Sequence, residues 1–121
     1  MVAGILIVDD SGYMRNRLKS AFGDDVHIVA EAENGAEAVQ LYKQYEDAVN
    51  VVLMDIVMRK ANGVKSTAAI KQIDPSATVL MVTSVGQKEK MKLAAKAGAD
   101  GYVTKPFDDA EIRQAVDAVV P

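Results

Sequence analysis

The sequence predicts an α/β fold in which five parallel strands form an open sheet with helices on both faces. Short apolar runs alternate along the chain with longer segments of helical period, and this alternation is typical of βαβ units. Most of the apolar runs lack the polar alternation of a half-exposed strand, which indicates burial on both faces of the sheet. Right-handed crossovers between such strands distribute the helices over the two faces.

The predicted strands are rich in Val, Ile, Leu and Met. They cover residues 4–9, 26–30, 51–55, 78–83 and 101–105. His27 interrupts the second run. We therefore expect this strand at an edge of the sheet, with the imidazole directed toward solvent rather than toward a ligand.

The segments between the strands show helical spacing. One apolar face is formed by Met14, Leu18, Ala21 and Phe22, and another by Ile112, Val116 and Val119. Ser11 can cap the first helix, and Asp108 with Glu111 resembles a capping box at the start of the last. A further helix is expected over residues 63–73, ended by the Asp-Pro pair at 74–75.

Length and composition indicate one domain that spans residues 1–121, with no room for a separate output domain. Half of the residues are hydrophobic, and the net charge of −3 is too small and mixed for a nucleic-acid-binding surface. The absence of cysteine suits a reducing compartment. The apolar run at residues 2–8 has no basic leader, and no run is long enough to span a bilayer. We expect a cytoplasmic protein that binds neither nucleic acid nor membrane.

Polar side chains stand at the carboxyl ends of four of the five predicted strands. They are Asp9, Asp10, Asp55, Thr83 and Lys105. Open α/β sheets bind ligands outside the carboxyl ends of their strands, so these residues should converge on one rim. Two like charges about 4 Å apart repel by roughly 4 kcal/mol at an effective dielectric of 20, so a cation is expected among the carboxylates. An all-oxygen site without cysteine favours Mg²⁺, which commonly shares phosphate oxygens and so indicates phosphoryl chemistry.

This pattern resembles the receiver domain of response regulators over essentially the whole chain. The acidic pair Asp9-Asp10, the single Asp55, Thr83-Ser84 and Lys105-Pro106 follow the first, third, fourth and fifth strands in the order and spacing of that family. The resemblance is strongest to stand-alone, CheY-like chemotaxis regulators. It implies a flavodoxin-like doubly wound sheet with strand order 2-1-3-4-5 and five helices, an order for which CheY itself is a standard example.

The resemblance also implies a role for each site residue. Asp55 would be the phosphoacceptor, and Asp9, Asp10, Asp55 and the backbone carbonyl of Val57 would hold Mg²⁺. The corresponding alternative for the aspartates is helix capping or a plain loop position.

Four further positions carry family roles. Lys105 would pair with the phosphoryl group, and Thr83 would hydrogen-bond a phosphate oxygen. Pro106 matches a proline that follows a cis peptide bond. Tyr102 matches a switch aromatic that turns inward, although a half-exposed strand tyrosine is an equal alternative.

The implied partners are a histidine kinase and an unknown downstream protein such as a motor switch component, and a monomer is expected. The lysines at positions 88, 90, 92 and 96 give one helix a basic face that can recognise an acidic partner segment, or can simply be solvated.

Some positions depart from the family pattern. Arg59 stands where proline is usual, and Ala61 where a larger apolar residue is usual. Arg59 either adds a cation near the phosphate or points to water. Val57 and Val85 occupy positions that tune phosphate lifetime, and we hypothesise that they slow attack by water.

Four other functions fit parts of the sequence. A phosphatase of the haloacid-dehalogenase type needs a second Asp two residues after the nucleophile, where Val57 stands. A flavodoxin-like cofactor binder needs a phosphate-binding loop after the first strand, where Asp10-Ser11-Gly12 stands. A phosphorelay carrier, or an interaction module that works without phosphate, would share the fold.

Overall fold

The structure is a computed structural model that describes residues 3–58, 62–84 and 86–120. Five parallel strands form one sheet in the order β2-β1-β3-β4-β5, as the resemblance implied. They are β1 (Ala3–Val8), β2 (Val26–Ala32), β3 (Val51–Asp55), β4 (Val79–Ser84) and β5 (Gly101–Lys105). The strand order reverses direction between β1 and β3, so the predicted switch point lies at their carboxyl ends.

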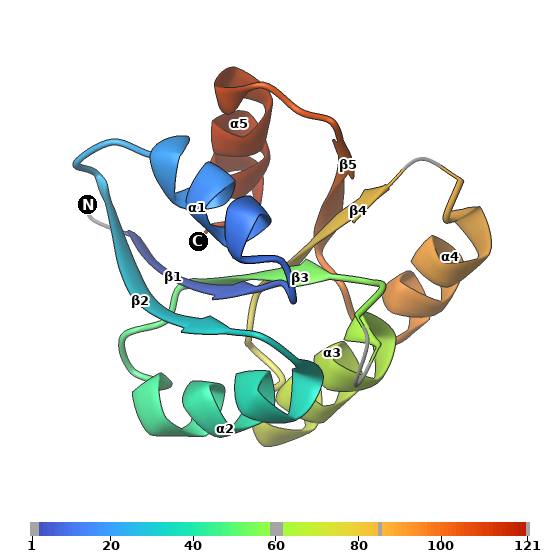
Figure 1. Cartoon of the computed structure of the whole chain (residues 1–121). Helices are drawn as coiled ribbons and strands as arrows, with labels where there is room; N and C mark the ends of the chain where they lie inside the picture. The colour runs from blue at the N-terminus through green and yellow to red at the C-terminus, as the bar shows by residue number, and fades with distance from the viewer. Residues whose placement is uncertain (1–2, 59–61, 85, 121) are drawn as a thin grey trace.

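Helices cover both faces of this sheet (Figure 1). They are α1 (Gly12–Ser20), α2 (Gly35–Tyr45), α3 (Gly63–Ile73), α4 (Lys88–Lys96) and α5 (Asp109–Val119). Helices α1 and α5 lie together on one side of the sheet, and α2 and α3 lie on the other (Figure 1). The α/β class and the alternation of strands and helices are therefore confirmed.

Two apolar clusters hold the layers together. The cluster under α1 and α5 includes Ile7, Leu53 and Ile112, and the cluster under α2, α3 and α4 includes Leu6, Val52 and Ile70. Neighbouring residues of β1 and β3 thus enter opposite clusters, which is why these strands are apolar without polar alternation. The two clusters leave the carboxyl ends of the strands as a polar rim.

The predicted helix starts are confirmed. The Ser11 side chain accepts a hydrogen bond from the Met14 backbone N–H at 3.2 Å and caps α1. Asp108 and Glu111 form the reciprocal capping box at the start of α5. Helix α3 has the predicted bounds and is capped by Asn62, a cap that the sequence reading did not identify.

Strand boundaries differ slightly from the prediction. Strand β2 continues two residues further than predicted, to Ala32. Strand β1 begins and ends one residue earlier than predicted, and β4 begins and ends one residue later. These strand ends are set by the pairing of residues on neighbouring strands, such as Val8 with Ala32. The apolar runs in the sequence do not indicate which residues pair, so they do not fix the strand ends. His27 is exposed on the edge strand β2, as predicted.

No helix in the described parts of the chain has the length and apolarity needed to cross a membrane.

Candidate functional site

The carboxyl ends of the strands bring the predicted site residues together. Asp9 and Asp10 directly follow β1, Asp55 is the last residue of β3, and Lys105 is the last residue of β5. The parallel ladders β1–β3 and β3–β4 end at the same edge of the sheet, which places the acidic pair beside Asp55. Asp9, Asp10, Asp55 and Lys105 therefore converge as predicted.

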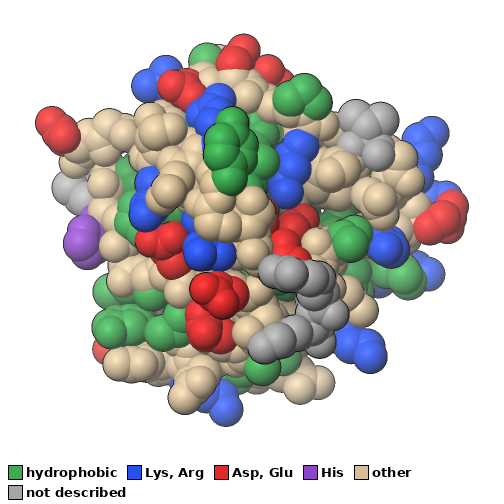
Figure 2. Space-filling model, viewed as in Figure 1, with side chains coloured by type: hydrophobic (Ala, Val, Ile, Leu, Met, Phe, Trp, Pro, Cys, Tyr) green, Lys and Arg blue, Asp and Glu red, His purple; other side chains and the backbone are tan. Residues whose placement is uncertain are grey.

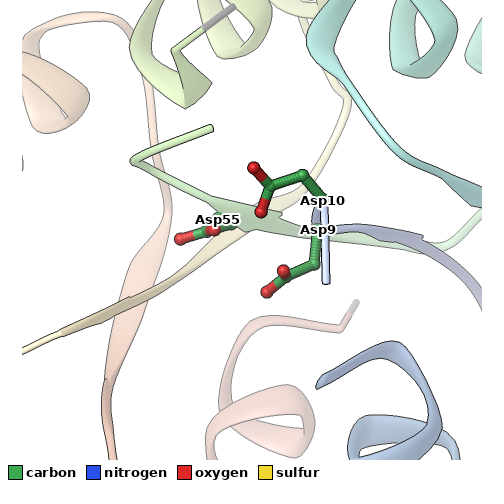
Figure 3. A group of neighbouring side chains, drawn as sticks. All are labelled: Asp9, Asp10 and Asp55. Atoms are coloured by element: carbon green, nitrogen blue, oxygen red, sulfur yellow. The ribbon is translucent and has the colours of Figure 1, made fainter. Parts of the chain in front are cut away.

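Three carboxylates form the centre of the site (Figure 3). Asp9, Asp10 and Asp55 each offer an oxygen within 4.8 Å of the others. Asp9 and Asp55 are buried, while Asp10 is half-buried at the mouth of the site. Figure 2 shows acidic side chains gathered in the middle of this face, with Lys and Arg side chains beside them.

Asp9 is held in place by hydrogen bonds to its side chain and to both of its backbone polar groups. Its Oδ1 accepts from the Ser11 backbone N–H at 2.9 Å, and its backbone N–H donates to the Ala32 carbonyl at 3.1 Å. Its own carbonyl accepts from Arg15 Nη1 at 2.8 Å. The acidic loop is thus held in one geometry by β2 and α1.

Lys105 supplies the positive charge of the site. Its Nζ lies 3.1 Å from Asp9 Oδ2 and 3.6 Å from Asp55 Oδ1. The ammonium group therefore bridges two of the three carboxylates and partly offsets their repulsion. The sequence reading assigned Lys105 to the phosphoryl group and did not anticipate its close pairing with Asp9.

Asp55 has a perturbed protonation equilibrium. Burial raises the pKa of its carboxyl group from 3.8 to about 6, and the Asp9 and Asp10 charges push it in the same direction. The Lys105 charge and a hydrogen bond from the Val57 backbone N–H act against this rise without cancelling it. A carboxylate that is costly to hold in its charged form is stabilised by a nearby cation.

Thr83 and Tyr102 lie on β4 and β5, the two strands that follow β3 in the sheet. Thr83 is 1 % exposed in β4, and its hydroxyl makes a long 3.5 Å contact with the Ser84 carbonyl, so it is only weakly engaged. Tyr102 is 59 % exposed and points away from the core, in agreement with the half-exposed alternative for this conformation. The Lys105–Pro106 peptide bond is cis, as the resemblance implied.

The remaining predicted positions follow β3 and β4. The Val57 side chain is half-exposed, and its role as a metal ligand through the carbonyl stays a prediction. Arg59, Ala61 and Val85 lie outside the described residues. The sequence reading missed Arg15 and Arg17, which contact the loops of the site, because a helical arginine gives no local signal of its target.

The donor set fits a hard divalent cation. Three carboxylates offer only oxygen atoms, and the chain has no cysteine. Mg²⁺ favours a few carboxylates together with water and phosphate oxygens, and the half-buried position of Asp10 leaves room for such ligands. Asp9, Asp10 and Asp55 can therefore hold the metal ion that the sequence predicts.

An open five-stranded α/β sheet with an acidic rim and a bridging lysine defines a phosphoacceptor receiver. The response regulator receiver domain family matches residues 5–117, and the chain belongs to this family. Receiver domains bind Mg²⁺ at an acidic pocket of this kind.

The individual relatives agree with this assignment. The chain is 48% identical over 120 residues to the chemotaxis protein CheY of Halobacterium salinarum, covering 99% of this chain and 98% of the relative. It is 38% identical to CheY of Bacillus subtilis, covering 97% of each. Among solved structures, the CheX-CheY-BeF3-Mg²⁺ complex from Borrelia burgdorferi matches with a TM-score of 0.90 and 32% identity, covering 96% of this chain and 87% of that one. The chain is thus a receiver homologous to CheY chemotaxis regulators.

Proposed function

We propose that this receiver is a two-component switch phosphorylated on Asp55 and used in the control of chemotaxis or motility. The observation that supports the proposal most strongly is the bridging of Asp9 and Asp55 by Lys105 Nζ, at 3.1 and 3.6 Å. The homology to CheY proteins supports the process. A phosphatase, a cofactor binder, a phosphorelay carrier and a phosphate-independent module are less well supported, because none explains both this cluster and these relatives.

In the proposed reaction, an Asp55 oxygen attacks the phosphorus of a phosphohistidine on a histidine kinase. A P–O bond to Asp55 forms as the P–N bond breaks, and the imidazole leaves with a proton from solvent. Asp9, Asp10, Asp55 and the Val57 carbonyl would hold Mg²⁺, which would supply neutralisation of the phosphoryl charge. Lys105 orients a phosphoryl oxygen and offsets its charge.

The chain acts as a phosphoacceptor that catalyses its own phosphotransfer and dephosphorylation, and not as an enzyme on a separate substrate. Burial favours metal binding in this reaction, because a carboxylate whose pKa is raised to about 6 is relieved of part of its desolvation cost when a metal ion engages it.

The output step is proposed to begin at Thr83. The Thr83 hydroxyl would donate its hydrogen bond to a phosphoryl oxygen instead of to the Ser84 carbonyl, and this change would draw the segment after β4 toward the site. Tyr102, which stands outside in this conformation, would then turn inward from its exposed position. If phosphorylation changes partner affinity about a hundredfold, the coupling is about 2.7 kcal/mol.

The downstream partner is proposed to read helix α4 and strand β5. The lysines at positions 88, 90, 92 and 96 are all exposed on α4, and a groove of about 490 Å³ lies beside them, lined by residues that include Met91 and Tyr102. A partner with an acidic segment, such as a motor switch component, would suit this surface. The protein is proposed to act as a cytoplasmic monomer.

Intact-mass spectrometry with acetyl phosphate tests the reaction. Wild type should gain one phosphoryl group in Mg²⁺ and none in EDTA, and Asp55→Asn should gain none in either. Asp10→Asn is the matched variant for the metal, and it should need a higher Mg²⁺ concentration for the same adduct. An adduct of equal size in Asp55→Asn would refute the assignment, and no adduct in any protein would favour a phosphate-independent module.

A further inference from the structure

Helix α1 carries an arginine that reaches across to the loop after β5. Arg17 Nη2 donates a hydrogen bond to the Phe107 carbonyl at 3.1 Å, and Arg17 Nη1 pairs with Asp109 Oδ1 at 2.6 Å. The guanidinium carbon also lies 5.1 Å from the centre of the Phe107 ring. One side chain therefore makes a backbone hydrogen bond and a cation–π contact with the loop after β5 and an ion pair with the first residue of α5.

This loop follows the lysine of the site. Phe107 stands two residues after Lys105, and α1 begins at Gly12, two residues after Asp10. Arg17 thus connects the element that follows the acidic pair with the element that follows the lysine. Figure 1 shows α1 and α5 on the same side of the sheet, in agreement with these contacts.

The position of Lys105 needs such a constraint. The ladder with β4 ends at the pair Ser84 and Lys105, so the next residues are not held by the sheet. The lysine side chain has four flexible carbons, and its ammonium group must stay near both Asp9 and Asp55 to serve the site. A shift of the loop by a fraction of an ångström would change these two distances unequally.

We propose that Arg17 is a positioning residue, which holds the loop after Lys105 against α1 and keeps the lysine ammonium between the Asp9 and Asp55 carboxylates. The inference rests on the proposed function, because it concerns the lysine that handles the phosphoryl group. It adds a residue on α1 that contacts neither the metal ligands nor the acceptor. The Arg17 side chain is 29 % exposed, so its replacement leaves no buried cavity.

The chemical accessibility of Lys105 tests the positioning directly. Brief acylation of surface amines, followed by peptide mass spectrometry, compares Lys105 with Lys71 in the same molecule. Lys71 is a matched internal reference, because its side chain is also 18 % exposed and is paired with one carboxylate, that of Asp100. Arg17→Ala should raise the ratio of Lys105 to Lys71 labelling at least about threefold. Arg17→Lys should raise this ratio less, because lysine keeps the positive charge but lacks the planar guanidinium that donates to two acceptors at once.

A double-mutant cycle then tests the consequence for phosphorylation. With acetyl phosphate and saturating Mg²⁺, Arg17→Ala should slow adduct formation between about three- and tenfold, below the roughly hundredfold cost of a fully misplaced group. In a Lys105→Ala background the same change should have no further effect, because Arg17 acts through Lys105. Arg113→Ala, which removes the same charge from an exposed position of α5, should leave the rate unchanged.

The outcomes separate the inference from the proposed function. If Arg17→Ala folds and leaves both the labelling ratio and the phosphorylation rate at wild-type values, Arg17 only stabilises the packing of α1 on α5 and the inference is wrong. An equal slowing in the Lys105→Ala background would also overturn it. If wild type forms no adduct, the proposed function fails, and the labelling ratio still decides whether Arg17 holds Lys105 in place.

Discussion

Replacement of Asp55 by asparagine should stabilise the fold in the absence of metal. Asparagine has nearly the same shape and retains an oxygen that can accept the Val57 N–H, but it carries no charge. Burial raises the pKa of the Asp55 carboxyl to about 6 in the folded protein, from the ordinary value of 3.8 that applies to the unfolded chain. A gap of about two pKa units corresponds to about 3 kcal/mol, at 1.4 kcal/mol for each unit.

The sign of the effect follows from the direction of the shift. Because the folded pKa is the higher one, the folded state binds the proton more tightly, and the charged carboxylate destabilises the fold. This destabilisation is absent below pH 3.8, grows as the pH rises toward 6, and is complete above about pH 7. Asp55→Asn should therefore gain up to about 3 kcal/mol over wild type at pH 7.5 and almost nothing at pH 4.

Urea denaturation in EDTA at several pH values measures the difference in the free energy of unfolding. Asp74→Asn is a control of opposite sign, because hydrogen bonds from Ser76 and Tyr42 lower the pKa of Asp74. Its charged form stabilises the fold above the unfolded pKa, so this variant should be less stable than wild type at pH 7.5. Equal or lower stability of Asp55→Asn at pH 7.5 would refute the reasoning on desolvation.

Three further predictions concern single positions. Gly63→Ala should lower the free energy of unfolding by about 1–3 kcal/mol, because a Cβ at this position would overlap the Asp55 carbonyl oxygen. Gly12→Ala is the control, since a Cβ there has only one neighbouring atom, and its stability should be unchanged. Thermal unfolding compares the two variants. Val57→Asn should shorten the phosphate half-life, because a polar side chain at this half-exposed position can orient water. A half-life that is unchanged or longer in a 32P decay assay would contradict this prediction. Asp108→Ala should cost about 1 kcal/mol in urea titrations by removing the cap of α5, and a cost below about 0.3 kcal/mol would contradict the capping role.

The sequence was sufficient for the parts of the fold that depend on local pattern. Buried strands such as Val51–Asp55 are read from continuous apolar runs, and the Asp108–Glu111 box is read from two residues in fixed spacing. The convergence of Asp9, Asp55 and Lys105 was also predictable, because all parallel strands end at one edge of the sheet. The strand order itself came from the family resemblance and not from the residues.

Other features required three-dimensional information. The pairing of Lys105 with Asp9 depends on how two loops approach one another, and the two residues lie 96 positions apart in the sequence. The contacts of Arg17 depend on the placement of α5 beside α1, which no local spacing specifies. The raised pKa of Asp55 depends on burial, and burial follows from the packing of the whole rim.

Residue-level mapping of the phosphoryl group tests the central assignment most directly. An aspartyl phosphate is reduced by borohydride to homoserine, so treatment of the phosphorylated protein marks the acceptor permanently, and peptide sequencing by mass spectrometry locates it. We expect homoserine at position 55 only, with a yield that requires Mg²⁺ during phosphorylation. Homoserine at position 9 or 10, or an unmarked residue 55 in protein that carries a phosphoryl group, would contradict the assignment of Asp55 as the acceptor.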